Sequence, residues 1–150
     1  MALFTSNKAL HAATAAMRER LSVPILSPAD YPRQKLIEMF MADESSCIFA
    51  SQAFFQGIDL PGRTLSLVVL DKLPFPPPND PLVEARSQRL ESLGKSSFSE
   101  YSLPEAAVAL KQGAGRLIRS ETDCGLLVVC DPRLTGMSYG KRLMSCLPPM

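Results

Sequence analysis

Short apolar runs alternate with longer stretches of helical periodicity, and this alternation constrains the fold more than any other feature of the sequence. The clearest run is Leu65–Leu70 (LSLVVL), which is almost continuously apolar, as expected of a strand covered on both faces. Leu126–Cys130 (LLVVC) is a second run of this kind and ends at Asp131 and Pro132. The pattern predicts an α/β fold with a mainly parallel central sheet, in which Leu65–Leu70 is a central strand.

The remaining elements extend the same alternation along the chain. Further strands are expected at Ala2–Thr5, Val23–Leu26 and Cys47–Ala50, and helices over residues 7–21, 32–41, 82–93, 104–112 and 139–147. Five prolines between Pro74 and Pro81 predict a rigid surface connection, and the serine-rich Gly94–Ser102 segment predicts a mobile loop. We therefore expect a parallel sheet of at least five strands with helices on both faces.

Length and charge set limits on function. The chain has 150 residues, 46% of them hydrophobic, which suits one folded domain with a substantial core. Sixteen basic and fifteen acidic residues give a net charge of +1, so no general attraction to nucleic acid or membrane is expected. No apolar run approaches the ~20 residues that span a bilayer, and no signal peptide is recognisable. The expected location is cytoplasmic, away from membranes.

The cysteines do not form a metal-binding pattern. The four cysteines contain no C-x-x-C pair, and the single His11 has no partner at ligand spacing. No metal site is therefore predicted. Cys47 and Cys130 lie in apolar runs, where reduced thiols are expected to act as small core residues.

Two arginines and two glycines are concentrated between Lys111 and Ser120 (KQGAGRLIRS). Arg116 and Arg119 are three residues apart, so on a helical turn both guanidinium groups point to one side and can hold the oxygens of one anion. Gly113 and Gly115 lack a Cβ and allow close approach of a backbone or a ligand. The alternative is a helix end with two solvated arginines.

Two other segments have only a partial resemblance to phosphoryl-transfer motifs. Gly57–Thr64 is one residue from a Walker A loop, with Arg63 in place of lysine, but it leads into a strand and contains Pro61, which lacks an N–H. Asp43 and Glu44 follow a helix pattern and are interpreted as a solvated helix end. The chain thus contains neither a complete nucleotide cradle nor a magnesium carboxylate.

Three segments are recognisable as sequence motifs: Leu3–Ser6, Ala50–Gly62 and Gln112–Arg119 (QGAGRLIR). In this order they resemble motifs IV, V and VI of superfamily 2 helicases, in the version of the DinG, YoaA and XPD group. Val69–Pro76 resembles the segment that follows motif V there. Together the motifs span nearly the whole chain.

The resemblance implies a RecA-like three-layer sandwich over residues 1–150, the second, C-terminal motor domain of an ATP-dependent DNA helicase. The first, ATP-cradling domain is not in this sequence and would be its partner within one polypeptide. ATP and Mg²⁺ would be used by the intact two-domain enzyme on single-stranded DNA, and neither would be bound by this chain alone. The isolated chain is therefore expected to be inactive as an ATPase.

The resemblance also assigns roles to residues on the nucleotide side. Arg119 would be the catalytic arginine finger and Arg116 a supporting contact. Nucleotide contacts would come from Gln112, Gly115, Gly57 and Asp59. For Gly57 and Asp59, a turn with a capping carboxylate is the open alternative.

Polar residues just past strand ends are the candidates for DNA contacts. Small hydroxyl and amide donors suit phosphate oxygens, and the residues concerned are Ser6, Asn7, Ser51 and Gln52. Ser6 and Asn7 equally suit helix capping. Phe54, Phe55 and Phe75 are candidates for base stacking, with core packing as the favoured alternative. Lys72, Tyr101 and Lys111 are left open between a ligand contact and plain solvent exposure.

Motifs IV, V and VI are expected along one edge of the sheet, because each falls near the boundary of an element. The competing hypothesis is a non-catalytic RecA-like module that binds nucleic acid or protein and never meets ATP. A third is a fragment whose exposed surface only reflects where the chain was cut. A Walker A motif encoded upstream of Met1 would favour the helicase interpretation.

Overall fold

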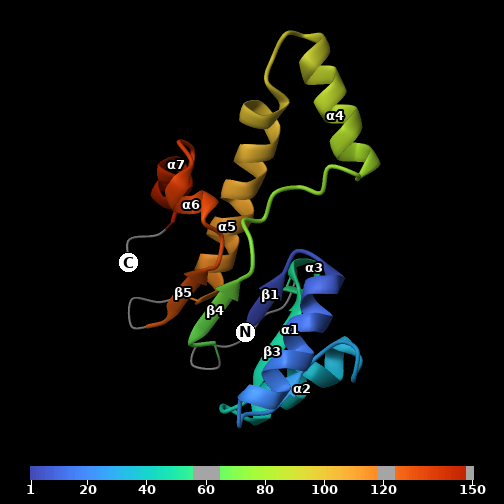
Figure 1. Cartoon of the computed structure of the whole chain (residues 1–150), viewed down its shortest axis with the longest axis vertical. Helices are drawn as coiled ribbons and strands as arrows, with labels where there is room; N and C mark the ends of the chain where they lie inside the picture. The colour runs from blue at the N-terminus through green and yellow to red at the C-terminus, as the bar shows by residue number, and fades with distance from the viewer. Residues whose placement is uncertain (56–64, 118–123, 148–150) are drawn as a thin grey trace. The chain divides into compact units, whose positions relative to one another are not determined.

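The computed structural model describes residues 1–55, 65–117 and 124–147 (Figure 1). The elements in chain order are β1 (Ala2–Phe4), α1 (Asn7–Arg20), β2 (Ile25–Leu26), α2 (Arg33–Ala42), β3 (Cys47–Ser51), α3 (Gln52–Phe55), β4 (Leu67–Leu70), α4 (Pro81–Ser92), the π-helix η2 (Phe98–Ser102), α5 (Leu103–Leu117), β5 (Leu126–Val129), α6 (Arg133–Gly136) and α7 (Gly140–Ser145). The predicted strands and helices are all present, with bounds that differ by a few residues. Within the described ranges, no helix is long and apolar enough to cross a membrane.

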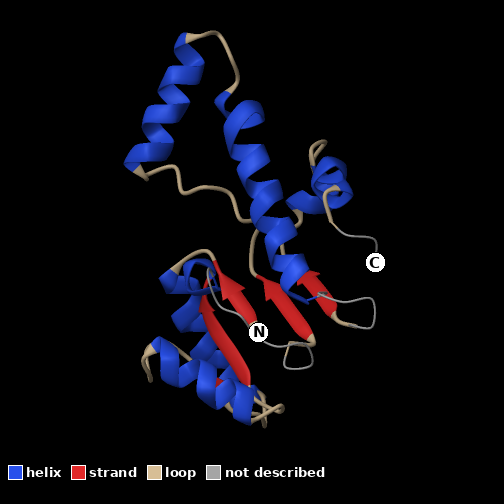
Figure 2. Cartoon of the chain, turned by 180° about the vertical axis from the view of Figure 1, so that it is seen from behind, coloured by secondary structure: helices blue, strands red, loops and turns tan. Residues whose placement is uncertain are grey.

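The five strands form one parallel sheet, shown as red arrows in Figure 2. Their order is β2-β3-β1-β4-β5, and every pairing is parallel. In register, Ala2 of β1 lies opposite Phe49 of β3 and Val69 of β4. The expected α/β class with a mainly parallel sheet is confirmed.

The chain divides into two compact units. The sheet unit comprises Met1–Lys72 and Gly115–Asp131, and the helical unit comprises Leu73–Ala114 and Pro132–Met150. The chain enters the helical unit directly after the end of β4 and returns within α5. Each unit is considered by itself below.

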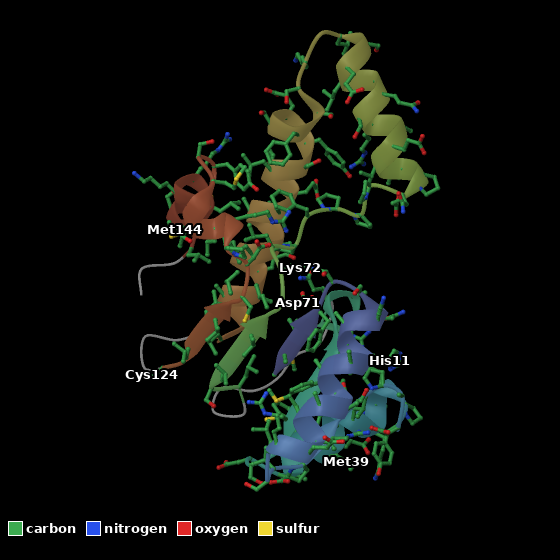
Figure 3. All side chains as sticks on the ribbon, viewed as in Figure 1. His11, Met39, Asp71, Lys72, Cys124 and Met144 are labelled. Carbon is green, nitrogen blue, oxygen red and sulfur yellow. The ribbon has the colours of Figure 1, made fainter. Side chains whose placement is uncertain are left out.

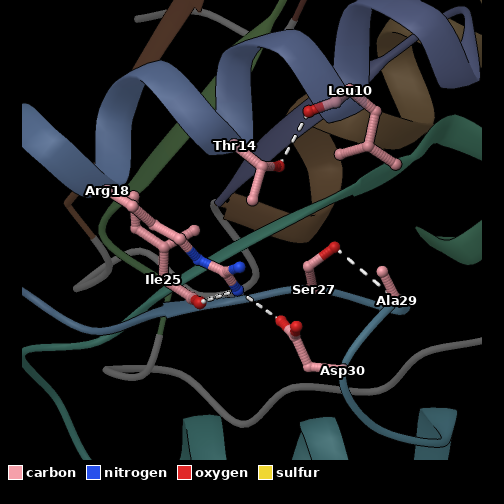
Figure 4. Close-up of polar contacts among 7 residues, drawn as sticks. All are labelled: Leu10, Thr14, Arg18, Ile25, Ser27, Ala29 and Asp30. Atoms are coloured by element: carbon pink, nitrogen blue, oxygen red, sulfur yellow. Dashed lines mark hydrogen bonds and ion pairs between the residues drawn. The ribbon is translucent and has the colours of Figure 1, made fainter.

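One helix of the sheet unit is fixed to the sheet by its polar ends and its apolar face. Ser6 caps α1, its Oγ accepting a hydrogen bond from the Ala9 N–H at 3.2 Å. At the other end, Arg18 donates to the Ile25 carbonyl at 3.0 Å and pairs with Asp30 (Figure 4). Between these ends, α1 contributes to a core cluster whose buried members are Ala2, Leu10, Ile25 and Phe49.

The two strands predicted to be buried differ in their surroundings. β4 is flanked by β1 and β5, and its Val68 is fully buried. β5 pairs only with β4, and its Leu126 is 61% exposed. The prediction of a second fully buried strand is wrong, because an edge strand has a neighbour on one side only. For the same reason Cys130, expected in the core, is exposed, while Cys47 is partly buried.

The helical unit begins with the proline-rich connection, which is irregular as predicted. Its second part, residues 77–80, is exposed, whereas Leu73 near its start is only 2% exposed. Asp80 then caps α4, its Oδ1 accepting from the Leu82 N–H at 2.8 Å and the Val83 N–H at 3.3 Å. Pro81 occupies the first turn, where its missing N–H costs nothing.

The loop expected over Gly94–Ser102 is confined to residues 94–96, and the prediction is wrong for the rest of the segment. Phe98–Ser102 forms the π-helix that continues directly into α5. The ring of Phe98 lies 5.6 Å from that of Phe75 and 5.2 Å from that of Tyr139, centroid to centroid. Its serines favoured a loop, but aromatic packing orders the segment.

These contacts decide between the two roles considered for Phe75. Its ring meets Tyr139 edge-on at 5.9 Å, and the guanidinium of Arg133 lies 5.2 Å from its centre. Phe75 is thus a packing residue of the helical unit, as favoured. Tyr101 is paired in a similar way, with Arg86 5.3 Å from its ring centre.

Candidate functional site

Three neighbouring strands end at the same edge of the sheet unit and carry the polar residues singled out above. Phe4 at the end of β1 pairs with Ser51 at the end of β3, and Leu3 pairs with Leu70 at the end of β4. In a parallel sheet the carboxyl ends of the strands share one edge, which is where ligands bind in open α/β folds. The carboxyl edge therefore brings together the four predicted DNA-contact residues Ser6, Asn7, Ser51 and Gln52.

The two serines at this edge both act as hydrogen-bond acceptors. Ser6 Oγ accepts from the Ala9 N–H, and Ser51 Oγ accepts from the Phe54 N–H at 3.4 Å. The capping role expected for Ser6 is confirmed. Because accepting a bond uses an oxygen lone pair, it leaves the hydroxyl hydrogen for donation to a second group. Capping and phosphate contact are thus compatible for each serine.

Asp71 and Lys72, both labelled in Figure 3, directly follow β4. They accept hydrogen bonds from residues at the ends of β1 and β3. Thr5 donates twice to Asp71, from its N–H to Oδ1 at 2.9 Å and from its hydroxyl to Oδ2 at 3.2 Å. The Gln52 amide donates to the Lys72 carbonyl at 3.5 Å. Sequence reasoning missed Thr5 and Asp71, although a carboxylate directly after a strand is a recognisable signal.

Phe54 has a partner in the sheet unit. The guanidinium of Arg33, at the start of α2, lies 5.5 Å from the centre of its ring. A cation over the ring face occupies a surface that base stacking would need. The side chain of Phe55 is outside the described residues.

The motif VI segment is helical in its described part. α5 extends past the predicted end at Gln112 to Leu117 and includes the backbone of Arg116. Gln112 and Gly115 are exposed. A Cβ placed on Gly113 or Gly115 would meet no described atom within 4 Å, so no described residue exploits the predicted close approach.

Several predicted nucleotide residues lie outside the described residues. They are Gly57, Asp59, Arg119 and the side chain of Arg116. The Walker A-like segment, residues 57–64, is outside as well. Their assigned roles remain predictions.

The last turn of α5 lies at the amino end of β5. A Cβ on Gly125, the residue before β5, would fall 2.5 Å from Cδ1 of Leu117, so the Leu117 side chain rests on that glycine. The expectation that all three motifs share one edge is wrong for Ser6 and the end of α5. A helix that connects parallel strands runs antiparallel to them, and its carboxyl end therefore lies at the amino edge.

Two groups at the amino edge have shifted pKa values. Burial lowers the pKa of the Met1 amino group, which donates to the Leu67 carbonyl at 2.7 Å. Hydrogen bonds from the hydroxyl and N–H of Ser45 lower the pKa of Asp43, the residue that ends α2. Asp43 is thus a helix-end residue, as predicted. Within residues 1–55, 65–117 and 124–147, no cluster of three His, Cys, Asp or Glu side chains is placed to hold a metal ion.

The sequence and fold define a class of protein. The profile of the family described as Helicase C-terminal domain (Helicase_C_2) matches residues 1–150, and the chain belongs to this family. Two solved structures share the fold. The first, XPD_Helicase, has a TM-score of 0.70 and 24% sequence identity, and the match covers 100% of this chain and 28% of that chain. The second, S. tokodaii Xpd4, has a TM-score of 0.62 and 24% sequence identity, and the match covers 96% of this chain and 28% of that chain.

The chain is also similar to curated relatives named DinG and YoaA. The chain is 44% identical over 149 residues to ATP-dependent helicase DinG of Mycobacterium tuberculosis, covering 99% of this chain and 22% of that protein. It is 39% identical over 147 residues to ATP-dependent DNA helicase YoaA of Escherichia coli, covering 98% and 23%. The chain therefore spans between a fifth and a quarter of the length of these relatives. The predicted resemblance is confirmed.

Proposed function

We propose that residues 1–150 form the second RecA-like motor domain of an ATP-dependent DNA helicase, acting with a first, ATP-cradling domain of the same polypeptide. The names of the curated relatives support ATP and DNA as ligands of the whole protein. The observation that carries the proposal is the carboxyl edge, where polar residues from motifs IV and V lie together at the ends of β1 and β3.

Single-stranded DNA would contact this edge through its phosphates. Ser6 and Asn7 lie at the start of α1, whose N-terminal N–H groups and dipole favour an anion. Ser51 and Gln52 lie one strand away, in register with the end of β1. Neutral donors of this kind position a backbone without reading sequence, so the contact would not depend on the bases.

ATP would be the substrate, bound on the side of the domain that carries the last turns of α5. Mg²⁺ and most of the nucleotide cradle would belong to the first domain, as the resemblance to two-domain helicases implies. Gln112 and Gly115 are exposed on the last turns of α5, where contact with a facing nucleotide is open to them. Arg119 would stabilise charge on the transferred γ-phosphoryl, with Arg116 in support and Gly57 and Asp59 near the ribose.

Steady-state ATPase kinetics of the full-length polypeptide with oligo(dT) test the DNA contact. A Ser6→Gly/Asn7→Ala variant removes both donors and largely preserves the cap, because glycine is well tolerated at that position. We expect the KM for DNA to rise about tenfold, as for two lost hydrogen bonds, while kcat at saturating DNA is retained. The matched control is Ser45→Ala, which removes a hydroxyl from the opposite edge.

An unchanged KM for DNA in the folded double variant would contradict the proposed contact. A full-length wild-type protein that binds oligo(dT) but hydrolyses no ATP would favour the non-catalytic binding module instead. Circular dichroism of each variant verifies that it is folded.

A further inference from the structure

We propose that Asp71 is a positioning residue, which holds the turn after β1 in the conformation that presents Ser6 and Asn7 to a DNA phosphate. This inference rests on the DNA contact proposed above and assigns a role to a residue outside the three motifs. It follows from the two hydrogen bonds that Thr5 donates to the Asp71 carboxylate.

The Asp71 carboxylate replaces the backbone carbonyl that would accept the next hydrogen bond between β1 and β4. The Val69 N–H donates to the Met1 carbonyl at 2.9 Å, and the Asp71 N–H donates to the Leu3 carbonyl at 3.0 Å. Parallel ladders repeat every two residues, so the following donor is the Thr5 N–H. That N–H bonds to the Asp71 side chain instead of a backbone carbonyl. The substitution ends the ladder and turns the chain from β1 into α1 at a defined point.

The second bond from Thr5 fixes the turn further. The Thr5 hydroxyl donates to the other carboxylate oxygen, so both oxygens of Asp71 hold the residue directly before Ser6. Two bonds from one residue to one carboxylate restrict rotation as well as distance. The position of the Ser6 hydroxyl therefore depends on Asp71, although the two side chains are not bonded to each other.

The neighbouring Lys72 extends the same link to motif V. The sheet order places β1 between β3 and β4, so the bond from the Gln52 amide to the Lys72 carbonyl passes over the end of β1. Asp71 and Lys72 thus hold the ends of β1 and β3 together. DNA contacts on the two strands would keep a constant spacing.

Because Asp71 is charged, its positioning role can be distinguished from a direct electrostatic effect on DNA binding. A carboxylate beside a phosphate track is repulsive, so removing its charge alone should tighten DNA binding. Removing its acceptor oxygens should weaken DNA binding by loosening the turn. Alanine removes both charge and acceptors, whereas asparagine removes the charge but keeps one acceptor for the Thr5 N–H and a donor for its hydroxyl.

The experiment measures ATPase kinetics of the full-length polypeptide against oligo(dT) concentration, with fluorescence anisotropy of labelled oligo(dT) at several salt concentrations. For Asp71→Ala we expect the KM and Kd for DNA to rise about three- to tenfold, with kcat at saturating DNA retained. Asp71→Asn should bind DNA at least as tightly as the wild type. The slope of log Kd against log salt should not change, since a positioning residue neutralises no phosphate.

Asp43→Ala is the matched control for stability. Asp43 also accepts bonds from a backbone N–H and a hydroxyl, both from Ser45, but it lies before β3 at the opposite edge. Its loss should lower the unfolding temperature and leave the KM for DNA unchanged. If Asp71→Ala fails to fold, Thr5→Val removes only the hydroxyl bond and should raise the KM for DNA about two- to threefold.

A folded Asp71→Ala protein with wild-type or tighter DNA binding would overturn the inference, as would an unchanged KM in Thr5→Val. The Ser6→Gly/Asn7→Ala variant separates this failure from that of the proposed function. If that variant raises the KM and Asp71→Ala does not, only the positioning role fails. If Ser6→Gly/Asn7→Ala leaves the KM unchanged, the DNA contact itself fails.

Discussion

Gly125 gives the most quantitative test of how the end of α5 is held. An alanine there would place its Cβ 2.5 Å from both Cγ and Cδ1 of Leu117 and 3.1 Å from Cδ2. Ordinary contacts of this kind are about 3.5–4.0 Å, so relief requires a shift of about 1 Å. Leu117 is 2% exposed, so its side chain is packed among other atoms. We expect part of the shift to pass to the last turn of α5, which carries Arg116.

Overpacking of this kind costs about 1–3 kcal/mol, which is roughly a 5- to 150-fold change in the folding equilibrium. Gly125 does not have a positive φ, so the clash alone is responsible. In the full-length polypeptide, the role proposed for Arg116 predicts that the same shift reduces ATP turnover by about 10²-fold, because catalytic groups tolerate little displacement. Leu117→Ala removes the side chain that the new Cβ would meet. The double variant Leu117→Ala/Gly125→Ala should therefore lose less stability than the sum of the two single variants.

Equilibrium urea denaturation of the chain, followed by circular dichroism, measures this loss. Gly136→Ala is the matched control, since a Cβ there meets no described atom within 4 Å. The control should change the free energy of unfolding by less than about 0.5 kcal/mol or stabilise the chain slightly. A Gly125→Ala midpoint equal to that of the wild type would refute the contact between Leu117 and Gly125.

Three further predictions follow from individual groups. Gly140→Ala should destabilise the chain by about 3 kcal/mol in thermal or urea denaturation. Its Cβ would lie 1.9 Å from the carbonyl oxygen of Leu134, a backbone atom that cannot rotate away. An unchanged midpoint would show that α6 and α7 pack differently. In the isolated 150-residue chain, the lowered pKa of the buried Met1 amino group means that the unfolded state binds this proton more tightly, so stability should rise with pH between the lowered pKa and about 8, and fall as pH falls. Acetylation of the amine should remove that slope in urea midpoints, and a slope that persists would assign it to another group. The isolated chain should hydrolyse ATP no faster than buffer and bind oligo(dT) weakly in anisotropy, and turnover abolished by Arg119→Ala would contradict its assignment as half of a site.

Periodicity and caps predicted most of the fold from sequence. Ser6 has the small hydroxyl of a capping residue and does cap α1, and the Leu65–Leu70 run does contain the strand flanked on both sides. These features are local, because a cap or an apolar run carries its information within a few residues.

The errors concern features that depend on distant partners. Gly94–Ser102 looked like a loop by composition, but Phe98 packs on Phe75 and Tyr139 far along the chain. Cys130 lies in an apolar run, but this run forms an edge strand and Cys130 is exposed. The order of the strands in a sheet cannot be predicted from any single segment. The motif VI segment was assigned to the wrong edge because the direction of α5 follows from its topology rather than from its residues.

The candidate site was predicted in part. The four polar residues of the carboxyl edge could be found because each lies at a strand end or within three residues after it. Their link through Thr5 and Asp71 was missed, since it joins residues 66 positions apart. The nucleotide side was assigned through the motif resemblance alone, and Arg119 awaits a direct test.

The most direct test of the central proposal is the DNA-stimulated ATPase of the full-length polypeptide with Arg119→Ala and Arg119→Lys. An arginine finger contributes about 10³–10⁵ in turnover, and lysine does not reproduce its planar fork. We therefore expect both variants to lose turnover by about this factor while the Kd for ATP changes much less, with circular dichroism verifying the fold. Near-wild-type turnover in a folded Arg119→Ala enzyme would contradict the proposal that this domain supplies the catalytic arginine.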